Sequence, residues 1–230
     1  METADRGVGL AAQAYATLKH AIITHELPPG TRLSVPMLAE RLGVSRSPAR
    51  EAIARITHEG LAHFEPNRGA VVANVDSTSL AEIYEIREVL EGLAARLAAT
   101  QITDTEIAEL RSLIAEHAAA VEAGDVEQHY ELDVRFHRRI HEIAGNATLT
   151  GQLERLQQQV RLAMYTTHRS PGGMPQALAE HRRIVDSLES RDSALAEAAG
   201  RSHISRLLRD LVAAQAAEAR EQPEISEQGA

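Results

Sequence analysis

The spacing of apolar residues divides the chain into a mixed N-terminal part and a helical C-terminal part. Before residue 75, apolar residues at helical spacing predict three helices, and two short extended runs follow them. The helices are expected at 10–26, at about 35–42 and between Ser45 and Gly60, and the extended runs at 61–64 and 70–73. Gly43 supplies the turn between the second and third helices, and residues 65–69 suit a hairpin tip. This order of elements is that of a winged helix-turn-helix.

Beyond a polar joint at residues 74–79, the pattern is amphipathic and rich in Ala, Leu and Glu. It predicts six helices, near 80–99, 104–123, 126–144, 148–168, 175–189 and 193–218. No strand pattern interrupts them, so this part is expected to be a helical bundle. The predicted fold class is therefore mainly α. We expect a DNA-binding domain at 9–75, a linker at 76–79, an all-helical domain at 80–218 and a disordered polar tail at 219–230.

Charge is distributed unevenly along the chain, and this changes how the net charge of −9 should be interpreted. Residues 1–75 carry a balance of +1 and the rest a balance of −10, and the segment 41–55 holds four Arg against one Glu. Distant acidic groups are screened beyond about 8–10 Å, so a locally basic helix remains compatible with DNA. The absence of Cys excludes disulfides and thiolate metal ligands, and no run resembles a membrane span or a signal peptide. We expect a cytoplasmic protein.

The start of the third helix carries the side chains that DNA recognition needs. Arg46 and Arg50 are spaced i, i+4 and share one helix face. Arg can pair bidentately with guanine, and the hydroxyls of Ser45 and Ser47 can contact phosphate. At the hairpin tip, Arg68 and Gly69 could enter the adjacent minor groove. The competing interpretation is that these residues form an ordinary solvated surface.

A second set of residues has the composition of a metal site. Asp133 and His137 are spaced i, i+4 on one predicted helix, and His181 and His203 lie on two others. One carboxylate and three imidazoles make an N3O ligand set suited to Zn, Ni, Mn or Fe. Spacing alone is weak evidence, since the chain has 11 His and structural or surface roles are common. The other histidines are expected mostly at the surface: His20, His25, His58, His63, His117, His129, His141 and His168.

The N-terminal part resembles the winged helix of the GntR family of bacterial regulators. The resemblance rests on residues 28–33, 42–53 and 58–61. It implies that Ser45, Arg46, Ser47 and Arg50 contact an operator, with Arg68 and Gly69 in the wing. The family often has an acidic residue soon after the position of Leu33, whereas this chain has Ser34-Val35-Pro36-Met37. This departure puts in doubt a DNA contact from the start of the second helix.

Residues 80–215 resemble the FCD effector domain of the FadR branch of that family. The matching segments are 84–91, 133–137, 143–146 with Leu149, 180–182, and Asp192 with His203. The resemblance implies that Asp133, His137, His181 and His203 bind a divalent cation, that Arg87 holds a carboxylate effector and that Asn146 lines the pocket. Two simpler roles stay open: an i, i+4 ion pair of Arg87 with Glu91 on a solvated face, and a helix C-terminal cap for Asn146.

Together these features predict a ligand-responsive transcription regulator with no catalytic residues and no membrane partner. It is expected to bind a pseudo-palindromic operator as a homodimer and to be gated by a small carboxylate at a divalent metal, Zn being preferred. One alternative is a metal-free regulator of the same fold that binds a larger ligand such as an acyl-CoA. Another is a metal-dependent hydrolase.

Overall fold

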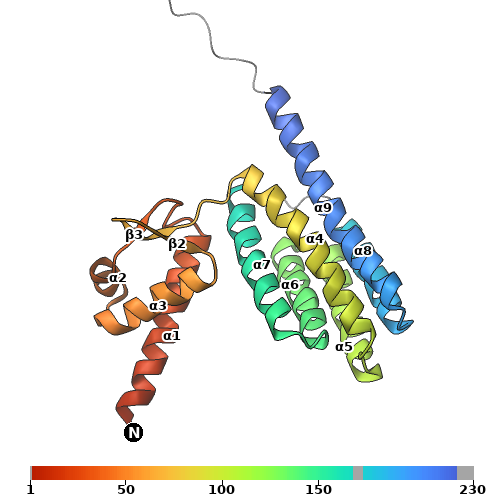
Figure 1. Cartoon of the computed structure of the whole chain (residues 1–230), viewed down its shortest axis with the longest axis horizontal. Coiled ribbons are helices and arrows are strands. Elements are labelled where there is room, and N and C mark those ends of the chain that lie inside the picture. Colours follow the sequence, from red (N-terminus) through yellow and green to blue (C-terminus); the bar gives the residue numbers. More distant parts are fainter. Residues whose placement is uncertain (1, 168–172, 222–230) are drawn as a thin grey trace, which may run out of the picture. The chain divides into compact units, whose positions relative to one another are not determined.

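The computed structural model describes residues 2–167 and 173–221, and its described residues fall into two compact units (Figure 1). The first contains the residues up to Leu80 together with those of helix α7 from Glu154 onward. The second contains the remaining described residues. The fold is mainly helical with one small sheet, which confirms the predicted fold class.

The N-terminal part is a three-helix domain with an antiparallel sheet. Its elements are α1 (Glu2–Ile23), β1 (Arg32–Leu33), α2 (Val35–Leu42), α3 (Arg46–His58), β2 (Ala62–Glu65) and β3 (Gly69–Val72). The strands lie in the order β1-β3-β2, with Arg32 opposite Val71 and Phe64 opposite Ala70. Ile22, Leu38 and Ile56, from the three helices, are each 0% exposed in its core.

Local chemistry explains where the helices of this domain begin and end. Ser34 caps α2 by accepting from the backbone N–H of Met37, and Gly43 ends that helix with a φ of 64°. Ser45 occupies the N-cap position of α3 as predicted, but its hydroxyl makes no capping hydrogen bond. Helix α1 ends at Ile23, because His25 adopts a left-handed φ of 58°.

A polar clamp joins α1 to the end of α3. The Tyr15 hydroxyl donates to Glu59 Oε1 at 2.6 Å, and Lys19 Nζ donates to Glu59 Oε2 at 2.8 Å. The guanidinium of Arg55 lies 3.7 Å from the centre of the Tyr15 ring, in cation–π geometry. These contacts hold α1 against the C-terminal end of α3, and the residues at the N-terminal end of α3 are mostly exposed.

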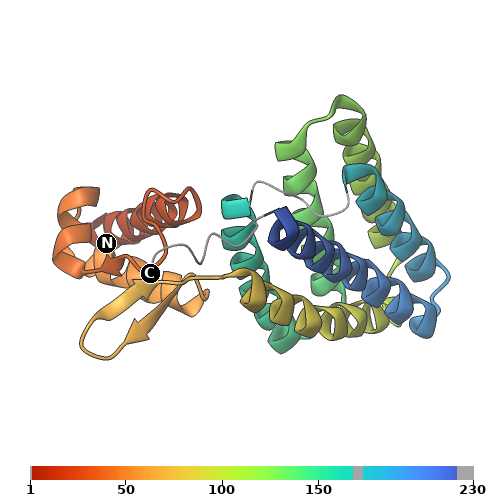
Figure 2. The same ribbon diagram turned by 90° about the horizontal axis from the view of Figure 1, so that it is seen from above.

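The C-terminal part is a bundle of helices (Figure 2). Its elements are α4 (Ser77–Ala99), α5 (Asp104–Ala123), α6 (Val126–Ile143), the start of α7 (Ala147–Thr167), α8 (Met174–Glu189) and α9 (Ser193–Glu221), and α7 belongs to the first unit from Glu154 onward. A capping box between Thr103 and Glu106 starts α5, and Gly124 ends it with a φ of 67°. Leu110, Phe136 and Leu188 lie in the core of the bundle and are at most 1% exposed.

Several boundaries differ from those predicted. The two-residue strand β1 was not expected, because it is too short to show alternation. Helix α1 begins at Glu2 rather than at residue 10, because the roughly two turns before residue 10 carry too few apolar residues to show helical spacing. Residues 77–79, expected in the linker, form the first turn of α4, where Asp76 accepts from the backbone N–H of Ser79 at 2.8 Å.

Helix α9 continues to Glu221, so the first three residues of the expected tail are helical. The rest of that tail, most of the expected break at 170–173 and residue 168 at the expected end of α7 lie outside the described residues. Within the described ranges, no helix combines the length and the apolar character needed to cross a bilayer.

Candidate metal centre and nucleic-acid interface

The structure brings Asp133, His137, His181 and His203 together from three helices of the second unit. Asp133 and His137 come from successive turns of α6, His181 from α8 and His203 from α9. One ligand atom from each residue lies within 4.8 Å of the others. His181 Nε2 is 3.4 Å from Asp133 Oδ1, and His137 Nε2 is 4.0 Å from the same oxygen. Tetrahedral ligand atoms around Zn lie roughly 3–3.5 Å apart, so small side-chain movements would close the set.

Aromatic packing orients the rings in this cluster. The Phe136 ring stacks on His181 with centroids 4.3 Å apart and planes 23° apart. The rings of His137 and His203 also stack, with centroids 5.1 Å apart and the same interplanar angle. Such contacts restrict rotation of the imidazoles before any ligand binds, which lowers the entropy lost on binding.

The nitrogens of this cluster lack the hydrogen bonds that buried polar atoms usually make. Neither ring nitrogen of His181 nor Nε2 of His203 has a hydrogen-bond partner within the described part of the chain. A buried unsatisfied polar atom costs about 1–3 kcal/mol. Burial lowers the pKa of His181 well below its ordinary value and also lowers the pKa of His203, so both rings are neutral near pH 7. Neutral imidazoles offer the lone pairs that a divalent cation requires, so the donor set fits a metal ion.

Arg87 lies in the interior beside this cluster. Arg87 Nη2 forms an ion pair with Glu91 Oε1 at 2.9 Å, and both side chains are 4% exposed. The simpler interpretation of Arg87 therefore identified the right partner but the wrong environment, since the face is buried and not solvated. Arg87 Nε has no hydrogen-bond partner among the described residues, so one N–H of the guanidinium is available to another acceptor.

Glu91 is a buried carboxylate that sequence reasoning did not place at the site. Its Oε2 lies 2.7 Å from His141 Nε2 and 3.4 Å from His137 Nδ1. Burial opposes ionisation of Glu91, but His141 and His137 outweigh that effect and hold its pKa well below the usual range. The i, i+4 spacing of Arg87 and Glu91 was visible in the sequence; the contact with α6 was not, because it depends on helix packing.

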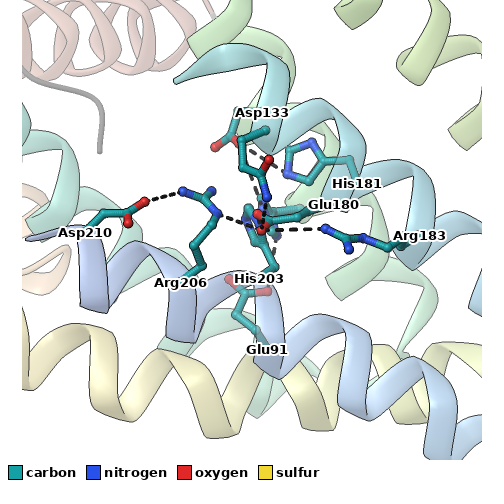
Figure 3. Close-up of polar contacts among 10 residues, drawn as sticks. Glu91, Asp133, Glu180, His181, Arg183, His203, Arg206 and Asp210 are labelled. Atoms are coloured by element: carbon teal, nitrogen blue, oxygen red, sulfur yellow. Dashed lines mark hydrogen bonds and ion pairs between the residues drawn. The ribbon is translucent and has the colours of Figure 1, made fainter. Parts of the chain in front are cut away.

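Glu180 is a second buried carboxylate that sequence reasoning did not assign to the site. Glu180 Oε2 lies 2.8 Å from His203 Nδ1, and Glu180 Oε1 accepts from Arg206 Nε at 2.6 Å (Figure 3). Arg206 in turn pairs with Asp210 at 2.6 Å. Burial opposes ionisation of Glu180, and hydrogen bonds from His203 and Arg206 nevertheless lower its pKa. Its position next to His181 in the chain was the signal that could have identified it.

Three histidines expected mostly at the surface are buried, which corrects that prediction. His117, His129 and His141 are 1%, 5% and 4% exposed. The Nε2 atom of His117 and the Nδ1 atom of His129 form a short hydrogen bond, and the His117 ring lies 5.3 Å from that of His181. Burial of these rings follows from helix packing that single-helix periodicity does not reveal. His168 lies outside the described residues.

Asn146 caps helix α7, whereas the sequence suggested a C-terminal cap on the preceding helix. Its side chain is exposed, and its Oδ1 accepts from the backbone N–H of Leu149 at 3.1 Å. This geometry is that of an N-terminal cap for α7 and not of a C-terminal cap for α6. Among the contacts of the described residues, none joins Asn146 to the Asp133 and histidine cluster.

The residues expected to contact DNA lie on the surface of the N-terminal domain. Ser45, Arg46, Ser47 and Arg50 are exposed at the start of α3, whereas the opposite face of that helix is buried. In the wing, Arg68 is exposed and pairs with Glu65 at 2.6 Å, and it also donates to the Gly30 carbonyl at 3.2 Å. Gly69 begins β3 with a φ of 80°, a conformation that favours glycine.

Profiles of two protein families match the two parts of the chain. The profile of the bacterial regulatory proteins of the gntR family matches residues 10–72, and the FCD domain profile matches residues 82–206, more than half of the chain. The chain belongs to the GntR family. It is a GntR-family transcription regulator with an FCD effector domain, so membership implies DNA binding and response to a ligand. Dimerisation is typical of the family.

Individual relatives of this GntR regulator agree with that assignment. The transcriptional repressor RspR of Escherichia coli K12 is 30% identical over 197 residues, covering 85% of this chain and 86% of the relative. The regulator McbR of the same strain is 29% identical over 187 residues, covering 80% and 85%. The structure of E. coli McbR/YncC matches with a TM-score of 0.70 and 25% identity over 91% of this chain and 98% of that one. RspR and McbR are both named as HTH-type transcription regulators.

Proposed function

We propose that this GntR regulator binds a pseudo-palindromic operator as a homodimer and is controlled by a small carboxylate at a divalent metal held by Asp133, His137, His181 and His203. The observation that carries the proposal is the convergence of these four ligand atoms within 4.8 Å, with buried imidazole nitrogens that have no hydrogen-bond partner within the described residues. The N3O set favours Zn, and Ni, Mn or Fe share its ligand chemistry.

The local charge supports an anionic effector. Glu91 is paired with Arg87 and Glu180 with Arg206, which leaves Asp133 as the carboxylate of the ligand set that balances a cation. A bound divalent cation would act as a Lewis acid for oxygen ligands and leave the centre with a net positive charge. The Nε of Arg87, which has no hydrogen-bond partner among the residues that the structure describes, offers a second contact for a carboxylate. The resemblance to metal-containing FCD domains agrees with this arrangement, and Asn146 is retained as a pocket residue only through that resemblance.

At the DNA-binding end, the exposed face of α3 supports recognition by Arg46 and Arg50. These two side chains are expected to read bases in the major groove, while Ser45 and Ser47 contact phosphate. Arg68 and Gly69 are expected to contact the DNA through the wing. Effector binding in the FCD domain would then shift the population of conformations available to the paired DNA-binding domains.

Metal content and ligand response test this function directly. Purified wild-type protein is compared with the double variant His181→Ala/His203→Ala, and the exposed pair His20→Ala/His58→Ala serves as the control. Elemental analysis should find one divalent ion per chain in the wild type and the control and none in the double variant. DNA selected from a random library then gives a target for affinity measurements with a panel of mono- and dicarboxylates. A double variant that keeps both its metal and its carboxylate response would overturn the proposal.

A further inference from the structure

Two buried groups of residues beside the candidate metal centre repeat the same arrangement. In the first group, Arg87 contacts one oxygen of Glu91, and the other oxygen faces His137 Nδ1 at 3.4 Å. In the second group, Arg206 contacts one oxygen of Glu180, and the other oxygen faces His203 Nδ1 at 2.8 Å. In each case an arginine, a carboxylate and a ligand histidine follow in that order.

We infer that Glu91 and Glu180 are positioning residues that hold His137 and His203 with their Nε2 atoms toward the metal. The inference rests on the metal site proposed above and goes beyond it, since neither carboxylate belongs to the ligand set. A neutral imidazole carries its proton on one nitrogen and can bind a cation only through the other. A carboxylate beside Nδ1 accepts a hydrogen bond from the protonated Nδ1 and thereby leaves the lone pair on Nε2 for the metal.

The two arginines show that each carboxylate acts as a hydrogen-bond acceptor. Arg206 is a donor, so Glu180 must present an acceptor to it, and the remaining oxygen must accept from His203. The same holds for Arg87, Glu91 and His137, where the longer distance of 3.4 Å allows a weaker contact. Glu91 also accepts from His141 at 2.7 Å, so its effect on His137 is shared with a second imidazole. We therefore expect Glu180 to have the larger effect.

Replacing Glu180 by glutamine separates the effect of the carboxylate on the His203 ring from the effect of side-chain volume. Glutamine has one acceptor oxygen and one donor amide, whereas both Glu180 oxygens face donors: Oε1 faces Arg206 Nε at 2.6 Å, with Gln176 and Arg183 farther away, and Oε2 faces His203 Nδ1 at 2.8 Å. If the oxygen faces Arg206, the amide faces His203 Nδ1 and forces the proton onto Nε2, which blocks metal binding. If the oxygen faces His203, the amide opposes the guanidinium. Either arrangement weakens metal binding, although the side chain keeps its volume.

The test measures metal affinity and the histidine tautomer in the full-length protein. Zinc affinity is determined by competition with a chromophoric chelator for Glu180→Gln and Glu91→Gln. Matched controls are Glu189→Gln, an exposed residue on the same helix as Glu180, and Glu85→Gln, an exposed residue on the same helix as Glu91. Loss of a carboxylate that orients a ligand histidine lowers metal affinity about 10- to 100-fold, and we expect this for Glu180→Gln, a smaller loss for Glu91→Gln and no change for the controls.

Nitrogen-15 NMR of the histidine rings without metal gives a readout that a general loss of stability would not produce. His203 should carry its proton on Nδ1 in the wild type and shift toward Nε2 protonation in Glu180→Gln. Wild-type zinc affinity and an unchanged tautomer in both glutamine variants would overturn the inference, provided that His203→Ala still loses zinc. If His203→Ala also keeps wild-type zinc affinity, the proposed metal site itself is wrong.

Discussion

Arg87 Nη2 lies 2.9 Å from Glu91 Oε1 in the interior of the helical bundle, and each side chain is only 4% exposed. Removing Arg87 leaves the buried Glu91 carboxylate with only His141 and His137 as partners, and breaking a buried ion pair typically costs about 3–5 kcal/mol. Arg87→Met is therefore expected to lower the free energy of unfolding by about that amount. Arg87→Met/Glu91→Gln should recover part of the loss, because it removes the isolated charge.

Urea denaturation checks this prediction at neutral pH with a chelator present. Arg138→Met is a suitable control, since Arg138 pairs with Glu142 but is 65% exposed, and such pairs contribute at most about 1 kcal/mol. A double variant no more stable than Arg87→Met would show that the pairing of Arg87 with Glu91 is not the source of the loss.

Zinc should stabilise the folded protein through the four proposed ligands. A ligand that binds only the folded state at a concentration 100 times its dissociation constant adds about 2.7 kcal/mol to the free energy of unfolding. We expect zinc to raise the unfolding midpoint of the wild type and a chelator to reverse the change. His181→Ala should not be stabilised by zinc, since His181 is 0% exposed and its Nε2 lies 3.4 Å from Asp133 Oδ1 within the proposed ligand set. Equal stabilisation of this variant would mean that zinc binds elsewhere.

The sequence predicted the elements better than it predicted the site. Apolar spacing located all the long helices, because each buries one continuous stripe, and turn residues such as Gly43 and Gly124 marked their ends. Asp133 and His137 were recognisable as a pair, since i, i+4 residues face the same way on any helix. Their meeting with His181 and His203 was implied only by the family resemblance, because spacing within one helix does not show which faces of other helices it contacts.

The residues that sequence reasoning missed owe their roles to contacts between helices. In the sequence, Glu180 looks like an ordinary acidic residue. Its role follows only from its contacts with His203 and Arg206 of α9. Likewise, His117 and His129 become neighbours only because α5 and α6 pack together. Asn146 shows a related limit: its place between two helices suits a cap on either one, and only its contact with the backbone N–H of Leu149 identifies an N-terminal cap for α7.

Arg46 and Arg50 are expected to determine which DNA sequence the protein prefers. Replacing either by Ala should cost about 1–3 kcal/mol of discrimination between the selected sequence and a mutated one. Fluorescence anisotropy with both DNA duplexes measures this difference. The control Arg138→Ala removes the same charge from an exposed position in the other unit. If Arg46→Ala and Arg50→Ala weaken binding to both duplexes equally, these side chains contact only the phosphate backbone.

Glu65 is expected to restrain the wing arginine. Arg68 pairs with Glu65 at 2.6 Å, and this contact lowers the pKa of Glu65, so the carboxylate is charged near pH 7. Glu65→Gln removes both a competitor for Arg68 and a negative charge close to DNA. We expect DNA affinity to rise about two- to fivefold, with a steeper dependence on salt. When Glu65→Gln is added to Arg68→Ala, DNA affinity should rise less than when it is added to the wild type. An equal rise in the two proteins would mean that Glu65 acts only through its own negative charge.

His117 is expected to make the folded protein sensitive to acid. Its burial, together with the neighbouring His129, lowers its pKa from 6.5 to about 4. As the pH falls through 6.5, the unfolded chain takes up a proton that the folded chain does not accept until about pH 4, so stability decreases across this window. His117→Gln removes this difference while retaining hydrogen-bonding groups. Urea denaturation at several pH values between 4 and 7, with a chelator present, should therefore show a smaller decrease in the variant. The quantity compared is the slope of the unfolding free energy against pH, not the stability at one pH. Equal slopes in the wild type and the variant would show that other groups account for the acid sensitivity.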